Sequence, residues 1–470
     1  MQFDATRFDT RTITINGKTL TVRAYENILY VAKPVDAALQ RINIYIPEAY
    51  FNGEKIGIYD AQTAPIFLPN QVGGYMPAQP GTLDGRGMPG AGDKPSTIAL
   101  ALARGYVVAS PGARGRTSQS SNGDYIGKAP AAIVDLKAAV RYLRFNDARM
   151  PGNAEKIISN GTSAGGALSA LLGASGNATD YQDELKKIGA ADSRDDIFAV
   201  SSYCPITNLE HADAAYEWQF NGVHDFKKID ISMLDYKMQR REIAGTLSPD
   251  QIELSNALKK QFPDYINSLH LIDNSGKALQ LDAQGNGSFK NYVMSLVIAS
   301  AQVALDQGQD LSRHTWLTIK AGKVRSIDFD GYVHYMGRQK LPPAFDGLDL
   351  STGENQLFGT ASRDKQHFTA FSAARSTHSN IADAHTIAMM NPMHYIGMPG
   401  VNTAQHWRIR HGTYDKDTGL AISTALALTL QKQHIAVDFA FPWDRPHSGD
   451  YDLDELFAWI DNLKAAREQP

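Results

Sequence analysis

The sequence predicts an α/β fold whose central sheet is mostly parallel and which is interrupted by one long insertion. Short β-rich runs alternate with helical runs up to about residue 205, as in βαβ units. The rhythm stops at about Ile206, where polar helical stretches and loops take over, and it returns after Pro392. We therefore expect one α/β domain built from residues 1–205 and 393–470, with an inserted domain at 206–392.

The first strands are expected close to the N-terminus. "RTITINGKTLTVRAY" alternates around Asn16-Gly17, a dipeptide that favours a two-residue β-hairpin turn. "QRINIYIP" and "APIFLP" are short β-rich runs that each end at a proline. "ALALARGYVVAS" predicts a helix that ends near Gly105 and leads into a buried strand.

Further helices and strands follow from the same patterns. "AAIVDLKAAVRYLRFN" has helical spacing, and "EKIISN" is a short apolar strand that leads into a glycine-rich turn. Inside the insertion, "DYKMQRREIAG" and "SPDQIELSNALKKQF" are interpreted as polar helices. The last elements are expected to be the strand "HWRIRHG", the helix "AISTALALTLQKQ", the strand "IAVDFAFPW" and the helix "DLDELFAWIDNLKAA".

Composition and charge exclude several functional classes. Hydrophobic residues make up 43% and charged residues 20% of the chain, as in ordinary globular proteins. The net charge of −4 provides no basic surface for nucleic acid and no polybasic patch for a membrane. The chain contains no signal-peptide pattern, no apolar run long enough to span a membrane, and a single cysteine, Cys204. A cytoplasmic protein with a small-molecule partner is expected, and its oligomeric state stays open.

Residues Gly161 to Gly165, "GTSAG", match the G-x-S-x-G pattern of a nucleophile elbow. In such an elbow a serine lies on a sharp turn between a strand and a helix, and the flanking glycines avoid clashes. "EKIISN" supplies the strand and "GALSALLGA" supplies a helix of small residues. The alternative is a small serine that allows close helix packing, but the context favours Ser163 as a nucleophile.

A serine nucleophile needs a histidine base and a carboxylate that orients the histidine. In this type of fold they follow the serine in the order acid, then histidine, each after a later strand. His447 lies in the loop after the last predicted strand and is the candidate base. Asp415 and Asp417 both follow the preceding strand, and spacing alone does not separate them.

Stabilising the oxyanion of an ester reaction requires two backbone N–H donors. One belongs to the residue after the serine, here Ala164, and the other to an early loop. "LPNQVGGYMP" contains Gly73 and Gly74 and is the candidate loop, with a plain turn as the alternative. No motif for a metal or an organic cofactor accompanies these residues, so none is expected.

With these residues in hand, the sequence resembles the bacterial tannases (tannin acyl hydrolases), in particular the single-chain form of lactobacilli. The resemblance extends over nearly the whole chain, and the stretches within the insertion are more specific than the elbow. The matching stretches are "PNQVGGY", "NGTSAGGA", "YCPITNLEHADAAYEWQFNG", "PAFDGLDL", "ENQLFG", "HWRIRHG" and "PWDRPHSGDYDL".

The resemblance implies an α/β-hydrolase fold with a large lid domain, and a serine esterase that hydrolyses galloyl esters to gallic acid and an alcohol or sugar. It assigns Ser163 as nucleophile, His447 as base and Asp415 as the catalytic acid. It also implies Gly74 as the early-loop oxyanion donor.

The resemblance implies a separate set of residues for binding the galloyl group. Asp417, together with Lys340 and Glu354 from the insertion, would bind the phenolic hydroxyls. The family carries a proline before that glutamate, which helps to sandwich the aromatic ring against an isoleucine. This sequence keeps Ile206 but has Gly353, which has no side chain to contact the ring.

Three alternatives remain. One is a serine peptidase of related fold, although nothing before Ile206 suggests the propeller domain of such enzymes. A feruloyl or broader aromatic carboxylesterase would share the fold and the reacting residues. A non-catalytic, hydrolase-like binding protein is the third alternative, disfavoured because every position of the Ser-His-Asp set is filled.

Overall fold

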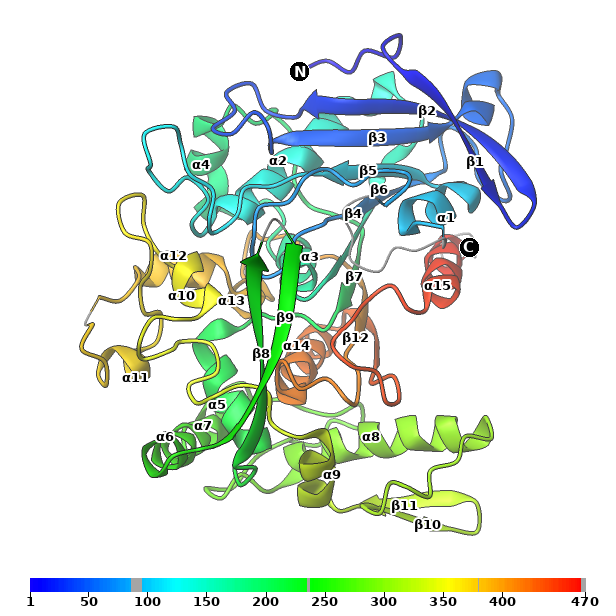
Figure 1. Ribbon diagram of the computed structural model, residues 1–470. Helices are drawn as coiled ribbons and strands as arrows, with labels where there is room; N and C mark the ends of the chain where they lie inside the picture. Colours follow the sequence, from blue (N-terminus) through cyan, green and yellow to red (C-terminus); the bar gives the residue numbers. More distant parts are fainter. Residues whose placement is uncertain (86–94, 235–236, 379, 466–470) are drawn as a thin grey trace.

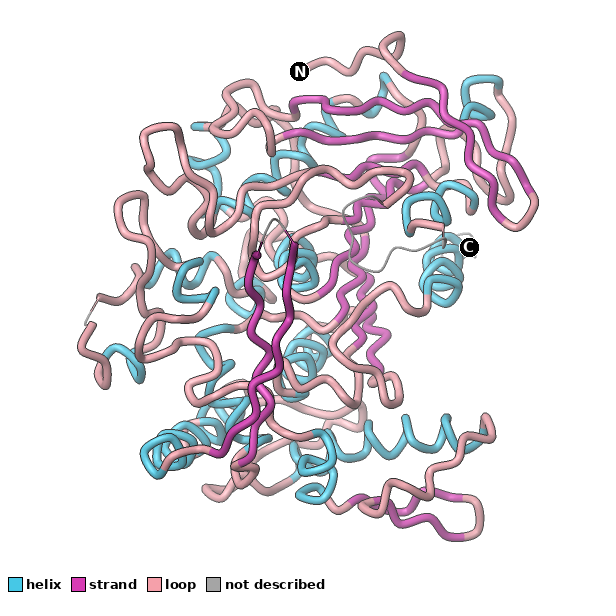
Figure 2. Tube along the Cα trace, in the orientation of Figure 1, coloured by secondary structure: helices cyan, strands magenta, loops and turns pink. Residues whose placement is uncertain are grey.

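The structure is a computed structural model that describes residues 1–85, 95–234, 237–378 and 380–465. Its main feature among these residues is a nine-stranded sheet in the order β1-β2-β3-β5-β4-β6-β7-β12-β13 (Figures 1 and 2). Its strands are β1 (Asp9–Ile15), β2 (Lys18–Leu29), β3 (Arg41–Pro47), β4 (Pro65–Pro69), β5 (Val107–Pro111), β6 (Asn153–Thr162), β7 (Ala199–Tyr203), β12 (His406–Arg410) and β13 (Ala436–Ala440).

The sheet is antiparallel at one edge and parallel elsewhere. Strands β1, β2, β3 and β5 pair antiparallel, whereas every pair from β5 through β4, β6, β7 and β12 to β13 is parallel. The pairing of Ile15 with Lys18 confirms the predicted hairpin at Asn16-Gly17. The carboxyl ends of the parallel strands therefore meet at one edge, where ligands bind in such sheets.

Helices cover the sheet, as a mostly parallel sheet requires. All residues of β4, β5 and β7 are buried, and so are those of α3. Of the described residues, no helix is both long and apolar enough to cross a lipid bilayer. The helices of this part are α1 (Thr97–Ala103), α2 (Ala131–Phe145), α3 (Ala164–Ala174), α4 (Gln182–Lys187), α14 (Leu420–Lys432) and α15 (Leu453–Ala465), with 3₁₀ helices at Glu48–Asn52, Asp147–Arg149 and Thr179–Tyr181.

The segment between β7 and β12 contributes no described strand to the main sheet. In Figure 1 it is coloured green to yellow, and its long β8–β9 hairpin stands apart from the main sheet, as Figure 2 also shows. The division at residues 206 and 392 stays a prediction. The segment contains α5 (Leu209–Phe220), β8 (Asp225–Leu234), β9 (Lys237–Thr246), α6 (Pro249–Lys259), α7 (Phe262–Ser268), α8 (Ser288–Asp306), β10 (Leu317–Lys320), β11 (Lys323–Ile327), α9 (Phe329–Met336), α10 (Gly353–Leu357), α11 (Ala370–Ala373), α12 (Ala384–Met389) and α13 (Pro392–Tyr395).

One predicted helix of the insertion is wrong and another is confirmed. The stretch from Lys237 to Gly245 is strand β9, which pairs with β8 along its length; Asp235 and Tyr236 lie outside the described residues. This polar stretch has no apolar stripe to hold it as a helix, so pairing with β8 decides its structure. The next stretch is α6, which begins with a Ser248–Gln251 capping box and Pro249.

Candidate active site

Ser163 occupies a sharp turn between the end of β6 and the start of α3. Its φ of 62° is in the left-handed region, which is unfavourable for a residue other than glycine. Backbone hydrogen bonds hold it there: its N–H donates to the Tyr203 carbonyl at 3.0 Å, and its carbonyl accepts from Ala167 at 2.9 Å and Ile206 at 3.2 Å. The turn has the strand–serine–helix context that the G-x-S-x-G pattern requires.

Close backbone contacts explain the two glycines of the pattern. A Cβ on Gly161 would lie 2.2 Å from the carbonyl oxygen of Gly165. A Cβ on Gly165 would lie 2.6 Å from the carbonyl oxygen of Val72, in the loop after β4. Both distances are far shorter than real contacts, so the turn leaves no room for a side chain at either position.

Ser163, His447 and Asp415 form one chain of hydrogen bonds. Ser163 Oγ is 2.9 Å from His447 Nε2, and His447 Nδ1 is 2.8 Å from Asp415 Oδ2. Asp415 follows β12 and His447 follows β13, so both loops start at the carboxyl edge of the sheet. Asp415 is fully buried, whereas 26% of the His447 side chain is exposed. This arrangement suits a base that reacts at one nitrogen and is oriented through the other.

The second aspartate lies next to the same histidine. Asp417 Oδ2 is 3.5 Å from His447 Nε2, and the Asp417 N–H donates to Asp415 Oδ1 at 2.9 Å. Asp415 therefore contacts the nitrogen that points away from Ser163, and Asp417 lies near the nitrogen that faces it. The geometry separates two residues that spacing alone could not.

Neighbouring charges lower the pKa of Asp415 and raise the pKa of His447, and both shifts favour an ion pair between them. Burial alone would raise the pKa of Asp415, but the neighbouring His447 and His411 lower it below its usual range. Burial alone would lower the pKa of His447, but Asp415, Cys204 and Asp417 raise it well above its usual range. The surroundings thus favour a carboxylate beside an imidazolium, the state that forms when the histidine has taken a proton.

Two residues that contact the Asp415–His447 pair, His411 and Cys204, belong to no sequence motif that would have predicted their position. His411 Nε2 is 3.5 Å from Asp415 Oδ2, and its Nδ1 is 2.8 Å from Ser423 Oγ, so it packs behind the acid. Burial lowers the pKa of His411. Cys204 Sγ is 4.0 Å from His447 Nε2 and donates to the Ser448 carbonyl at 3.4 Å. Neither position belongs to a motif, since both contacts arise only when distant strands align.

The candidate oxyanion donors lie on elements that are fixed to the elbow. Ala164 is the first residue of α3, and an N–H at this position has no acceptor within its own helix. Gly74 has a φ of 54° within a turn closed by a hydrogen bond of 2.9 Å from the Met76 N–H to the Gly73 carbonyl. The Tyr75 hydroxyl donates to the Ile206 carbonyl at 2.7 Å, which ties this turn to the residue bonded to Ser163.

Charged groups from three segments converge beside Asp417. Lys340 Nζ is 3.3 Å from Asp417 Oδ1, and the Gln339 amide donates to the same oxygen at 3.0 Å. Burial raises the pKa of Glu354, on α10, and the positive charge of Lys340 opposes that rise. Lys340 thus contacts Asp417, and Glu354 lies close enough for the charge of Lys340 to act on its pKa, whereas Gln339 was not singled out from sequence.

The space beside Gly353 is filled by an arginine from another part of the chain. A Cβ on Gly353 would lie 3.1 Å from Arg116 Cζ and 3.2 Å from its Nε. A side chain at this position would therefore push the guanidinium away. Arg116 had no sequence motif, because its neighbours at residues 74 and 353 are set by the fold.

One group in the described residues has ligand types suited to a metal ion. Potential ligand atoms of Cys204, Asp415 and His447 lie within 4.8 Å of one another. However, Asp415 and His447 already share a hydrogen bond, and burial raises the pKa of the Cys204 thiol. The arrangement therefore suits the hydrogen-bonded dyad better than a metal centre.

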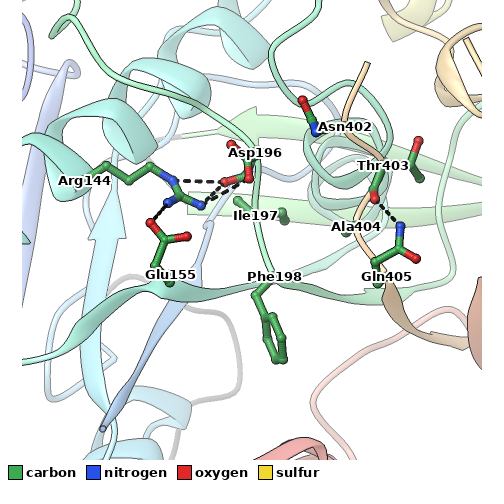
Figure 3. Close-up of a pocket in the computed structure, with 9 residues that line it drawn as sticks. All are labelled: Arg144, Glu155, Asp196, Ile197, Phe198, Asn402, Thr403, Ala404 and Gln405. Carbon is green, nitrogen blue, oxygen red and sulfur yellow. Dashed lines mark hydrogen bonds and ion pairs between the residues drawn. The ribbon is translucent and has the colours of Figure 1, made fainter. Parts of the chain in front are cut away.

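A cavity of about 280 Å³ lies elsewhere, before the amino ends of β7 and β12 (Figure 3). Arg144, which lines this cavity, forms ion pairs with Glu155 at 2.6 Å and with Asp196 at 3.4 Å. The charged side chains of the cavity wall are therefore paired with one another. Ser163 follows the carboxyl end of β6, at the opposite edge of the parallel sheet. This cavity is therefore separate from the candidate active site.

Known structures resemble the whole chain. A structure of Fusobacterium nucleatum tannase is 52% identical, with a TM-score of 0.94 over 98% of this chain and 99% of that one. A structure of tannase from Lactobacillus plantarum is 45% identical, with a TM-score of 0.95 over 98% and 99%. A tannin acyl hydrolase in complex with ethyl gallate is 46% identical, with a TM-score of 0.92 over 98% of both chains. The family model BD-FAE matches residues 89–252. None of the curated proteins matches.

The sheet order, the strand–serine–helix turn and these likenesses define the class of protein: an α/β-hydrolase that acts on carboxylic esters. Within that class, the chain belongs to the bacterial tannases. The predicted fold class, family and type of enzyme are confirmed.

Proposed function

We propose that this protein hydrolyses galloyl esters to gallic acid and an alcohol or sugar, through a Ser-His-Asp triad and a galloyl-enzyme. The observation that carries the proposal is the chain of hydrogen bonds from Ser163 to His447 to Asp415, with Lys340 and Asp417 directly beside it. Two solved structures of tannin acyl hydrolase, 46% and 45% identical to this chain, contain ethyl gallate and 3,4-dihydroxybenzoate, respectively.

Acylation begins when Ser163 Oγ attacks the ester carbonyl while His447 Nε2 takes its proton. Asp415 holds the imidazole by its Nδ1–H and stabilises the imidazolium. The N–H groups of Ala164 and Gly74 are proposed to hold the oxyanion. When the tetrahedral intermediate collapses, the alcohol leaves with the proton from His447, and the galloyl group stays on Ser163.

Deacylation repeats the sequence with water. His447 removes a proton from a water molecule, which attacks the galloyl-enzyme carbonyl. Collapse of the second intermediate returns the proton to Ser163 Oγ and releases gallic acid. The chain's own residues supply every proton transfer in this scheme.

Specificity is proposed to come from the edge of the aromatic ring that carries the three adjacent hydroxyls. Lys340 offers donors, while Asp417 and Glu354 offer acceptors, and all three are partly shielded from water. Without a hydroxylated ring these polar groups would lose partners, and such sites can reject the wrong analogue by about 10⁴-fold in favourable cases. Ile206, which is 4% exposed, is proposed to pack against the ring.

The insertion is proposed to act as a lid that carries part of the binding site. Lys340 and Glu354 both belong to residues 206–392, whereas Ser163, Asp415 and His447 lie just after strands of the main sheet. The insertion is thus proposed to supply part of the specificity, while Asp417 follows strand β12 together with Asp415. A small-molecule ester is the proposed partner.

The test compares methyl gallate with methyl benzoate and methyl ferulate. We expect methyl gallate to be strongly preferred by wild-type protein. Lys340→Ala should lower kcat/KM for methyl gallate by about 10- to 100-fold, as for the loss of one or two hydrogen bonds to a charged group. It should leave methyl benzoate within about twofold, because that ester has no hydroxyl to bind.

Lys323→Ala is the matched control, since Lys323 is exposed on β11. Lys323→Ala should leave kcat/KM unchanged for both methyl gallate and methyl benzoate. Equal wild-type rates on the three esters would point to a broader carboxylesterase, and no turnover of any ester would contradict the proposal altogether.

A further inference from the structure

Arg116 bridges two parts of the candidate site that lie far apart in the sequence. We propose that it is a positioning residue that holds the turn at Gly73–Met76 against helix α10, so that binding of the acyl group is coupled to stabilisation of the oxyanion. The inference rests on the proposed function, because it takes Gly74 as an oxyanion donor and Glu354 as a ligand of the acyl group.

The first side of the bridge is the turn. The Arg116 backbone N–H donates to the Tyr75 carbonyl at 2.8 Å, and its Nε donates to the Gly74 carbonyl at 2.8 Å. Gly74 and Tyr75 have φ angles of 54° and 56°, so both central residues of the turn are left-handed. Because glycine has the greatest backbone freedom, the orientation of Gly74 depends on such external bonds. Arg116 thus restrains both central carbonyls of the turn.

The second side of the bridge is α10. Arg116 Nη1 donates to Gln356 Oε1, and the guanidinium lies against the backbone of Gly353. Glu354 stands between these two residues in the sequence. A shift of α10 when Glu354 engages the acyl group would therefore move the partners of the Arg116 guanidinium.

The arginine is built into a closed ring of hydrogen bonds. Gln356 donates to Asp364 at 2.9 and 3.0 Å. Lys128 Nζ donates both to Asp364 Oδ1 and to the Arg116 carbonyl, each at 2.8 Å. The ring thus returns to Arg116, and the Lys128 side chain is only 5% exposed. A side chain fixed in this way has lost its freedom before substrate arrives, as a positioning role requires.

Bridging two acceptors needs the planar fork of a guanidinium. Nε and Nη1 point in fixed directions, one to Gly74 and one to Gln356. A lysine ammonium keeps the charge but is a single point, so it cannot reproduce both bonds in this geometry. Arg116→Lys therefore keeps the positive charge but loses the simultaneous hydrogen bonds to Gly74 and Gln356, so it tests the two hydrogen bonds separately from the charge.

The experiment measures kcat on methyl benzoate and methyl gallate, and the Kd of gallic acid, for Arg116→Met and Arg116→Lys. Removing an oxyanion donor costs about 10²- to 10³-fold in kcat, so loosening one should cost about tenfold or more on both esters. Gallic acid should also bind more weakly to both variants. Arg325→Met, on the exposed face of β11, is the matched control and should behave as wild type.

Gly353→Ala keeps every hydrogen-bonding group and covers the case in which Arg116→Met fails to fold. Its methyl group would meet the guanidinium at 3.1 Å, so kcat should fall on both esters, by less than in Arg116→Met. A kcat within twofold of wild type on methyl benzoate in folded Arg116→Met or Gly353→Ala would overturn the inference. If the wild-type protein shows no preference for methyl gallate over methyl benzoate, that result would instead count against the proposed function.

Discussion

At the scale of single residues, the chemistry depends on the charges around one imidazole. Asp415 and Asp417 approach opposite nitrogens of His447, at 2.8 and 3.5 Å, and Cys204 lies 4.0 Å from the nitrogen that faces Ser163. The carboxylates stabilise the protonated ring, so they help His447 once it has taken a proton. They also keep the resting ring protonated to a higher pH.

This arrangement predicts the acid limb of the pH profile. A protonated His447 cannot accept the proton of Ser163, so kcat/KM should fall as the pH drops through the pKa of His447. Because that pKa is raised, the limb should lie above the usual histidine value of about 6.5. Methyl benzoate is the suitable substrate for the measurement, because it has no phenol to ionise.

Asp417→Asn tests the cause of that shift. It removes a negative charge 3.5 Å from His447 Nε2, so the acid limb should move to lower pH. An unchanged limb in this variant, or a wild-type limb at or below the usual histidine value, would contradict the electrostatic account.

At the scale of elements, the elbow is held by contacts between backbones. Gly161 at the end of β6 and Gly165 in α3 approach so closely that neither tolerates a Cβ. Gly161→Ala should therefore lower kcat and destabilise the fold by about 1–3 kcal/mol, the usual cost of overpacking. Thermal unfolding and ester hydrolysis measure the two effects.

Gly73→Ala is the control for stability. A Cβ on Gly73 would meet no atom within 4 Å. Its melting temperature should match that of the wild type. A Gly161→Ala protein with unchanged melting temperature and kcat would show that the close approach is not required.

The sequence predicts those elements whose structure is determined by a few adjacent residues. The hairpin at Asn16-Gly17 and the elbow at Ser163 are encoded by a few adjacent residues, and both were predicted. The stretch at Lys237–Gly245 has a weak pattern of its own, and its pairing with β8 could not be inferred. Arg116 was missed for a related reason, because its partner Gln356 is 240 residues away.

At the scale of the whole molecule, the candidate site depends on segments that only the fold brings together. Ser163 and His447 are 284 residues apart, and the insertion lies between them. A buried ion pair links the segment that carries Lys340 to α5, the first helix of the insertion. Arg338 Nη2 is 2.5 Å from Glu217 Oε2 on α5, and both side chains are fully buried. Arg338 Nη1 also donates to the Lys340 carbonyl at 3.2 Å. The proposed ligand Lys340 is thus fixed to α5, which follows β7.

The central claim is that this fold makes Ser163 carry the acyl group, and trapping the intermediate tests it most directly. Protein mixed with excess methyl gallate is quenched in acid within the first turnovers, digested and analysed by mass spectrometry. The account predicts one galloyl group on the peptide that contains Ser163, and neither adduct nor turnover for Ser163→Ala. A galloyl group on a different residue, or undiminished turnover by Ser163→Ala, would contradict it.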